Sequence, residues 1–131
     1  MALFNTIAAT IVDSVVSNPA SVEIAPYGIY QLEGLGVLIA RTIISGSQTG
    51  VLLLGHTTHS KSVLERSVIR GSGTAGVLVR FGSAAHVSGS MLNNNRIGIL
   101  NEGVVETRGD NTMSGNGTEV SGNALVPFAP M

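Results

Sequence analysis

The sequence contains no cysteine and no tryptophan, and only 4% of its residues are aromatic and 11% charged. Without cysteine the chain forms no disulfide, no thiolate metal site and no cysteine nucleophile. Its seven basic and eight acidic residues give a formal net charge of −1 at pH 7. General nucleic-acid binding requires a dense basic patch, so this composition argues against a nucleic-acid partner.

The 131 residues are instead 44% hydrophobic and include 17 glycines. This content, together with frequent Val, Ile, Ser, Thr and Asn, is typical of short strands separated by tight turns. Disordered chains combine low hydrophobicity with high charge, which excludes disorder here. We expect a single domain over residues 1–131.

A five-residue motif recurs along the chain, with a small polar residue, two apolar residues, a small or polar residue and then Gly, Asn or Ser. The copies are SVVSN (14–18), TIISG (42–46), SVIRG (67–71), SMLNN (90–94) and NTMSG (111–115). Successive copies start 28, 25, 23 and 21 residues apart. A period of this length is typical of solenoids built from stacked coils.

Two further apolar runs accompany each motif. One run follows it, as SVEI (21–24), GVLL (50–53), GVLV (76–79) and GILN (98–101). The other precedes it, as GVLI (36–39), SVL (62–64), HV (86–87) and VV (104–105). The sequence therefore predicts an all-β fold, a right-handed parallel β-helix (β-solenoid) with about five coils of three short strands.

Alternation along the strands predicts which side chains point inward. One inward column consists of Val16, Ile44, Ile69, Leu92 and Met113. A second consists of Val22 and Ile24, Val51 and Leu53, Val77 and Val79, and Ile99. We expect the coils to occupy residues 14–116, with surface loops at residues 26–36 and 55–61.

The two ends of the coil stack need separate interpretations. Residues 1–13 form either an amphipathic cap helix or an incomplete coil, and a strand over residues 10–12 is favoured. Residues 117–131 lose the period and carry Pro127 and Pro130, which predicts a covering tail. The N-terminal segment lacks the basic region of a signal peptide and is too short and polar to span a bilayer, so no membrane insertion is expected.

Residues 10–17 (TIVDSVVS) and 109–118 (GDNTMSGNGT) resemble bacterial right-handed parallel β-helix repeat proteins of unknown function, which are distantly related to the pectate-lyase superfamily. The resemblance covers residues 9–131 and implies the C-terminal portion of such a protein, secreted or at the cell surface. The superfamily's enzymes are polysaccharide lyases and hydrolases, and its other members include adhesins and phage tail fibres. These motifs specify a fold, and fold alone does not establish an activity.

The position before each motif holds Asp13, Arg41, Arg66, Gly89 and Asp110, which a solenoid stacks on one face. Because the superfamily's lyases bind acidic sugars through Arg or Lys, the resemblance makes Arg41, Arg66 and Arg70 candidate carbohydrate-binding residues. The alternative is a surface ladder in which Asp13 and Glu65 balance the arginines.

Other motifs favour structural roles. The segment GSGTAG (71–76) matches a dinucleotide-binding pattern, but a strand follows it where that pattern requires a helix, so we expect a turn. His56 and His59 lie in a polar loop without a third ligand, and His86 is expected to face solvent. Acidic residues crowd the last coil, and neither a glycosidase pair nor a calcium site is favoured there.

The sequence therefore favours a non-catalytic structural or interaction module, of a surface or adhesin-like kind, that associates with itself. The alternative is a carbohydrate-binding or lyase-like protein acting on acidic polysaccharides. We predict no catalytic residue, no metal site and no cofactor.

Overall fold

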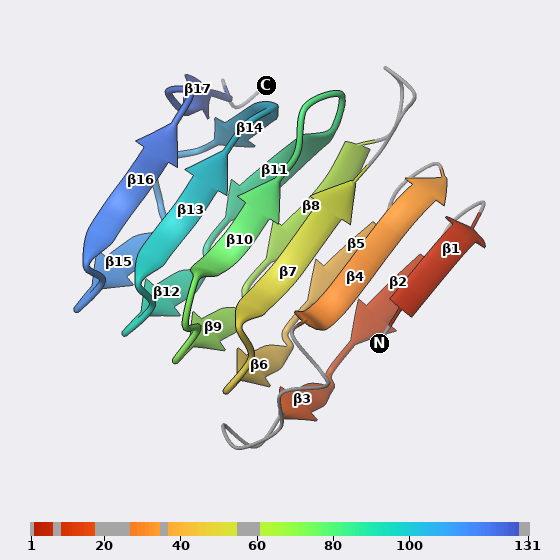
Figure 1. The fold of residues 1–131 in the computed structure, drawn as a ribbon, viewed down its shortest axis with the longest axis horizontal. Helices are drawn as coiled ribbons and strands as arrows, with labels where there is room; N and C mark the ends of the chain where they lie inside the picture. The colour runs from red at the N-terminus through yellow and green to blue at the C-terminus, as the bar shows by residue number, and fades with distance from the viewer. Residues whose placement is uncertain (1, 7–8, 18–26, 35–36, 55–60, 129–131) are drawn as a thin grey trace.

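The computed structural model describes residues 2–6, 9–17, 27–34, 37–54 and 61–128, and these residues form strands and turns without a helix. The strands belong to three parallel sheets (Figure 1). The first sheet contains β1 (Ala2–Thr6), β4 (Tyr27–Gly34), β7 (Thr49–Leu54), β10 (Ala75–Val79), β13 (Ile97–Asn101) and β16 (Thr118–Gly122).

The second sheet contains β2 (Ala9–Val12), β5 (Val37–Ala40), β8 (Lys61–Glu65), β11 (Ala84–Ser88), β14 (Val104–Thr107) and β17 (Val126–Pro127). The third sheet contains β3 (Val15–Ser17), β6 (Ile43–Ser45), β9 (Val68–Arg70), β12 (Met91–Asn93) and β15 (Thr112–Ser114).

Each coil contributes one strand to each sheet, and every strand pairs in parallel with its counterparts in the neighbouring coils. The chain passes through the third sheet five times, so it completes four turns between β3 and β15. The winding is right-handed (Figure 1), as expected for connections between parallel strands. The predicted all-β parallel β-helix is confirmed.

Stacked aliphatic side chains fill the interior. Ile44, Ile69 and Leu92 are adjacent in the register of the third sheet and are fully buried. Val16 and Met113 continue this column at its partly buried ends. Inward residues of the first and second sheets complete the same core, among them Val51, Val77, Ile99, Ile39 and Val87. The predicted inward columns are therefore confirmed for the described residues.

Glycine allows the backbone at the start of the first-sheet strands to pack closely against the next coil and the core. Gly28, Gly50, Gly76 and Gly98 occupy equivalent positions at the start of β4, β7, β10 and β13. A Cβ atom on Gly50 would lie 2.6 Å from the Gly76 carbonyl oxygen and 2.6 Å from Ile69 Cγ2. The backbone of each coil thus packs against the next coil and the core at a distance that excludes a side chain.

Small polar side chains connect successive coils at the corners. In one corner the Thr42 and Ser67 amides donate to the hydroxyls of Ser67 and Ser90, at 3.1 and 3.2 Å. In the other, the Ser72 amide donates to Asn95 Oδ1 at 3.0 Å, and Asn95 Nδ2 donates to the Ile69 carbonyl at 3.2 Å. These side chains thus bond to backbone groups at the corners between the strands.

One expected loop is wrong. The segment 26–36, interpreted as a surface loop, contains β4, in which Ile29 pairs with Val51 and is fully buried. Val22 and Ile24, which were predicted to lie in one inward column with Val51, are outside the described residues. Residues 55–60 of the second expected loop are also outside them. The strand favoured over residues 10–12 is present as part of β2, and the cap-helix alternative fails, because β1 and β2 are strands that pair with β4 and β5.

The expected tail over residues 117–131 carries two strands. β16 pairs with β13 in the first sheet, and β17 pairs with β14 in the second sheet. Loss of the motif thus did not mark the end of the solenoid. Within the described part of the chain, no helix has the length and hydrophobicity needed to span a membrane.

Candidate functional site

Asp13, Arg41, Arg66 and Gly89 occupy the turns between the second and third sheets. Their φ angles are 52°, 48°, 48° and 55°, in the left-handed region. The amides of Asp13, Arg41 and Arg66 each donate at 3.1 Å to a carbonyl of the next coil, which holds this conformation in place. The predicted column therefore exists along one corner from Asp13 to Gly89, with the side chains of Asp13, Arg41 and Arg66 pointing outward and Gly89 contributing backbone alone. We call it the corner ridge.

Arg41 is paired within the corner ridge. Its Nε and Nη2 atoms donate to the two carboxylate oxygens of Asp13 at 2.6 and 3.1 Å. The hydrogen bond from Arg41 holds the pKa of Asp13 below its ordinary value. The positive charge of Arg41 is therefore balanced, as the surface-ladder alternative predicts for this residue.

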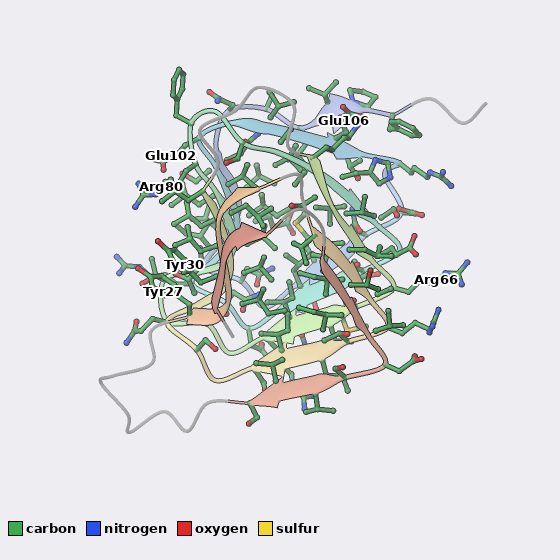
Figure 2. The ribbon with its side chains drawn as sticks, turned by 90° about the vertical axis from the view of Figure 1, so that its right-hand side faces the viewer. Tyr27, Tyr30, Arg66, Arg80, Glu102 and Glu106 are labelled. Carbon is green, nitrogen blue, oxygen red and sulfur yellow. The ribbon has the colours of Figure 1, made fainter. Side chains whose placement is uncertain are left out.

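Arg66 and Arg70 lie in different settings. Arg66 makes no ion pair within the described residues, and Figure 2 shows its side chain extending outward from the coil stack. Arg70 is the last residue of β9, on the outer face of the third sheet between Ser45 and Asn93. It is four residues from Arg66, about 13 Å along extended chain. Of the three candidate arginines, Arg66 lines a hollow.

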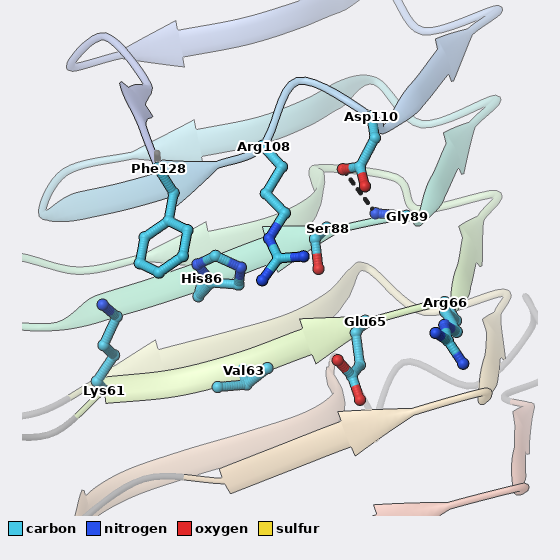
Figure 3. A pocket seen from close by; sticks show the side chains of 10 residues that line it. All are labelled: Lys61, Val63, Glu65, Arg66, His86, Ser88, Gly89, Arg108, Asp110 and Phe128. Atoms are coloured by element: carbon cyan, nitrogen blue, oxygen red, sulfur yellow. Dashed lines mark hydrogen bonds between the residues drawn. The ribbon is translucent and has the colours of Figure 1, made fainter. Parts of the chain in front are cut away.

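That hollow, which we call the second-sheet hollow, has a volume of about 450 Å³ and opens on the outer face of the second sheet (Figure 3). Its lining comes from three coils and the C-terminal segment, and consists of Lys61, Val63, Glu65, Arg66, His86, Ser88, Gly89, Arg108, Asp110 and Phe128.

Phe128 forms one wall of the second-sheet hollow. Its ring meets the His86 imidazole edge-on, with centroids 4.5 Å apart and an interplanar angle of 80°. Lys61 Nζ and Arg108 Cζ lie 5.5 and 5.6 Å from its centroid, within the range of cation–π contacts. His86 is consequently only 8% exposed, which corrects the expectation that it faces solvent.

The charges around the second-sheet hollow are only partly paired. Lys61 Nζ lies 2.8 Å from Glu106 Oε1, and Asp110 Oδ1 accepts a hydrogen bond from the Gly89 amide at 2.9 Å. Among the described residues, Arg66, Arg108 and Glu65 have no ion-pair partner. Guanidinium donors and carboxylate acceptors therefore both face the hollow, a combination that suits a ligand carrying a carboxylate and hydroxyl groups.

The remaining sequence motifs have structural partners. Gly71 has a φ of 69°, and residues 71–74 form the turn before β10, as predicted. Glu102 pairs with Arg80 at 2.9 Å, and both project at the same side of the stack (Figure 2). No group of three metal-ligating residues occurs in the described ranges, and His56 and His59 lie outside them.

A second candidate surface lies on the outer face of the third sheet. Val15, Ile43, Val68 and Met91 are consecutive in its register and point outward. Val15 is 70% exposed, Ile43 36% and Met91 41%. We call these four residues the apolar column. The next outward position of the same strands is polar, with Ser17, Ser45, Arg70 and Asn93.

Comparison with known proteins identifies no relative: no protein-family model, curated protein or solved structure matches this chain significantly.

Proposed function

We propose that this chain is a non-catalytic β-solenoid interaction module that associates with a second copy of itself through the apolar column. The observation that carries the proposal is the exposure of Val15, Ile43 and Met91 on β3, β6 and β12 of one sheet, with Val68 of β9 in register between Ile43 and Met91. When the outer face of a sheet is exposed to water, its residues are ordinarily polar and alternate along each strand with the apolar residues of the core. Contiguous apolar residues there are typical of contact surfaces.

A sheet face suits self-association because two copies can meet face to face around a two-fold axis. Each column would then cover the other, with the polar residues beside it at the rim. The column is narrow, so the buried area falls in the range of weak and transient contacts. A role at the cell surface, and a relationship to bacterial pectate-lyase-like proteins, rest on the resemblance of residues 10–17 and 109–118.

The test is light scattering coupled to size exclusion over a range of protein concentrations. Ile43→Lys combined with Met91→Lys places two charges in the apolar column and should shift association to higher concentration. The matched control, Ser17→Lys with Ser114→Lys, adds the same charge at two exposed serines that lie in register with the outward polar residues of this sheet, and it should leave association unchanged. Equal behaviour of all three chains would refute the proposal.

Binding of an acidic saccharide is a second candidate function, supported by the second-sheet hollow. Arg66 and Arg108 would bind a uronate carboxylate, while Glu65 and Asp110 would accept hydrogen bonds from hydroxyl groups. The original candidates Arg41 and Arg70 contribute less, because Arg41 is paired and Arg70 lies at the far end of β9.

Calorimetric titration with uronate oligomers tests this candidate. Arg66→Ala with Arg108→Ala should weaken binding at least tenfold, as expected for charge-assisted hydrogen bonds worth roughly 1.5–3 kcal/mol. Arg96→Ala, an exposed arginine on another side of the coil, should have no effect. Absence of binding by the unmodified chain would eliminate the candidate.

A further inference from the structure

The turn between β10 and β11 presents the most exposed large apolar side chain in the described chain. Phe81 is 88% exposed. The turn is tight: the Ser83 amide donates to the Arg80 carbonyl at 3.0 Å, and Gly82 has a φ of 86°. The Arg80 amide in turn donates to the Leu53 carbonyl at 3.0 Å, which fixes the turn to the neighbouring coil. The Phe81 ring is thus exposed to solvent on a well-anchored turn, in the connection between β10 and β11 (Figure 1).

A hollow of about 330 Å³ adjoins this ring. Its lining consists of Phe81, Gly82, Ser83, Ala84, Glu102, Gly103, Val104 and Asn123. Val104, at its edge, is 46% exposed, and Val126 nearby in the same sheet is 45% exposed. The surface therefore carries both an apolar projection and an apolar depression.

The floor of this hollow is rigid. A Cβ atom on Gly103 would lie 2.6 Å from the Arg80 carbonyl oxygen, so the next coil packs directly beneath the turn. The Gly103 amide donates to Oδ1 of the buried Asn101 at 3.1 Å, and Asn123 Nδ2 donates to the Gly103 carbonyl at 3.0 Å. A depression with a fixed floor loses little conformational freedom when it is filled.

We infer that Phe81 and the adjoining hollow form a second docking site for another copy of this chain, with each Phe81 inserted into the hollow of the other copy. A two-fold contact requires a surface that is complementary to itself, and a projection beside a matching depression satisfies this requirement. Arg80 and Glu102 form an ion pair with each other at 2.9 Å at this rim, and both side chains are still partly exposed. In the inferred two-fold contact, the Arg80–Glu102 pair of one copy would lie against that of the other, so that opposite charges can meet across the axis.

The energetic core of such a contact is a single aromatic residue surrounded by a polar rim, the arrangement found at interface hot spots. This site deepens the proposed self-association without depending on the apolar column. Two different two-fold surfaces on one chain join copies into species larger than a dimer.

Sedimentation velocity at protein concentrations up to about 1 mM, the range of weak association, tests the two surfaces separately. In the Ile43→Lys/Met91→Lys background, only the Phe81 surface is intact, and we expect a monomer–dimer equilibrium. Adding Phe81→Ser should weaken this dimer at least 30-fold, the effect of removing a hot-spot aromatic residue. Adding Phe81→Leu instead, which keeps an apolar projection, should retain most of the association.

A chain that stays monomeric in the Ile43→Lys/Met91→Lys background would overturn the inference about Phe81. So would a dimer that Phe81→Ser does not weaken. In a chain that carries Phe81→Ser alone, the apolar column is the remaining proposed contact surface. If this chain does not dimerise, the proposed function is refuted, whereas the inference about Phe81 is not. Because the Phe81 side chain is largely exposed to solvent, its substitution should leave the circular dichroism spectrum and the unfolding midpoint unchanged.

Discussion

The three-residue strands β6, β9 and β12 carry two apolar columns on opposite faces. The inner column, Ile44, Ile69 and Leu92, is fully buried, whereas Ile43 and Met91 of the outer column are 36% and 41% exposed. Each outer residue directly precedes an inner one in the same strand, and both columns consist of apolar side chains. The difference lies in what they contact: the inner column holds the coils together, and the outer column is available to a partner.

The largest contrast is expected between Ile69→Ala and Val68→Ala. Ile69 is fully buried, so its truncation removes packing and leaves a cavity, at a cost of about 2–5 kcal/mol. Val68 points outward, and its truncation should cost within about 0.5 kcal/mol. Urea unfolding of the two variants measures both values, and similar losses would contradict the assignment of inner and outer faces.

Two glycines extend the contrast to the backbone. Gly50→Ala places a methyl group against the Gly76 carbonyl and Ile69, whereas Gly73→Ala meets only the flexible end of the exposed Gln48 side chain. We expect Gly50→Ala to cost about 1–3 kcal/mol, as overpacking does. Gly73→Ala should be close to neutral. Thermal unfolding of both chains provides the comparison, and a neutral Gly50→Ala would show that the coils are packed less tightly.

Loss of the corner hydrogen bonds should have an effect of similar size. Asn95→Ala leaves the Ser72 amide and the Ile69 carbonyl without their side-chain partner, which should cost about 1–3 kcal/mol. Arg96→Ala, at the neighbouring exposed position, is the matched control and should change the free energy of unfolding by less than about 0.5 kcal/mol. Equal effects would exclude a stabilising role for the Asn95 side chain.

The smallest effect is expected on the corner ridge, where Asp13 and Arg41 are both largely exposed. Because Arg41 lowers the pKa of Asp13 in the folded chain, the pair stabilises the fold above the pKa of the unfolded carboxyl. This contribution is lost as pH falls through the lowered pKa of the folded state. Unfolding of the unmodified chain and of Asp13→Asn should therefore converge at acidic pH and in high salt. A difference that persists at acidic pH would contradict the ion pair.

The sequence was sufficient to predict the solenoid and most of its core. The repeating motif placed Ile44, Ile69 and Leu92 in one column because register in a parallel stack repeats with the coil. It misplaced the first coil, since residues 21–24 copy the apolar pattern, whereas Gly28 and Ile29 align with Gly50 and Val51. The recurring glycine was the better signal, because its position is fixed by close backbone packing.

The candidate sites were less predictable. The second-sheet hollow combines Arg66 with Arg108 and Phe128, which are distant in sequence, and Phe128 follows the region where the motif ends. The apolar column was not predicted, because the alternating pattern served to identify the inward residues and the apolar character of the outward residues was not considered. Ile43, Val68 and Met91 were all present in the motif, so two apolar residues in each copy already indicated two apolar faces.

The most direct test of the two faces uses the absence of native cysteine, which makes each introduced thiol unique. Met91→Cys and Leu92→Cys are labelled with a thiol reagent under native conditions at increasing protein concentration. We expect the thiol of Leu92→Cys to be protected at every concentration. The thiol of Met91→Cys should react rapidly in dilute solution and progressively more slowly as copies associate. Equal reactivity of the two thiols, or a Met91→Cys labelling rate independent of concentration, would contradict the central claim that one face forms the core and the other forms a contact.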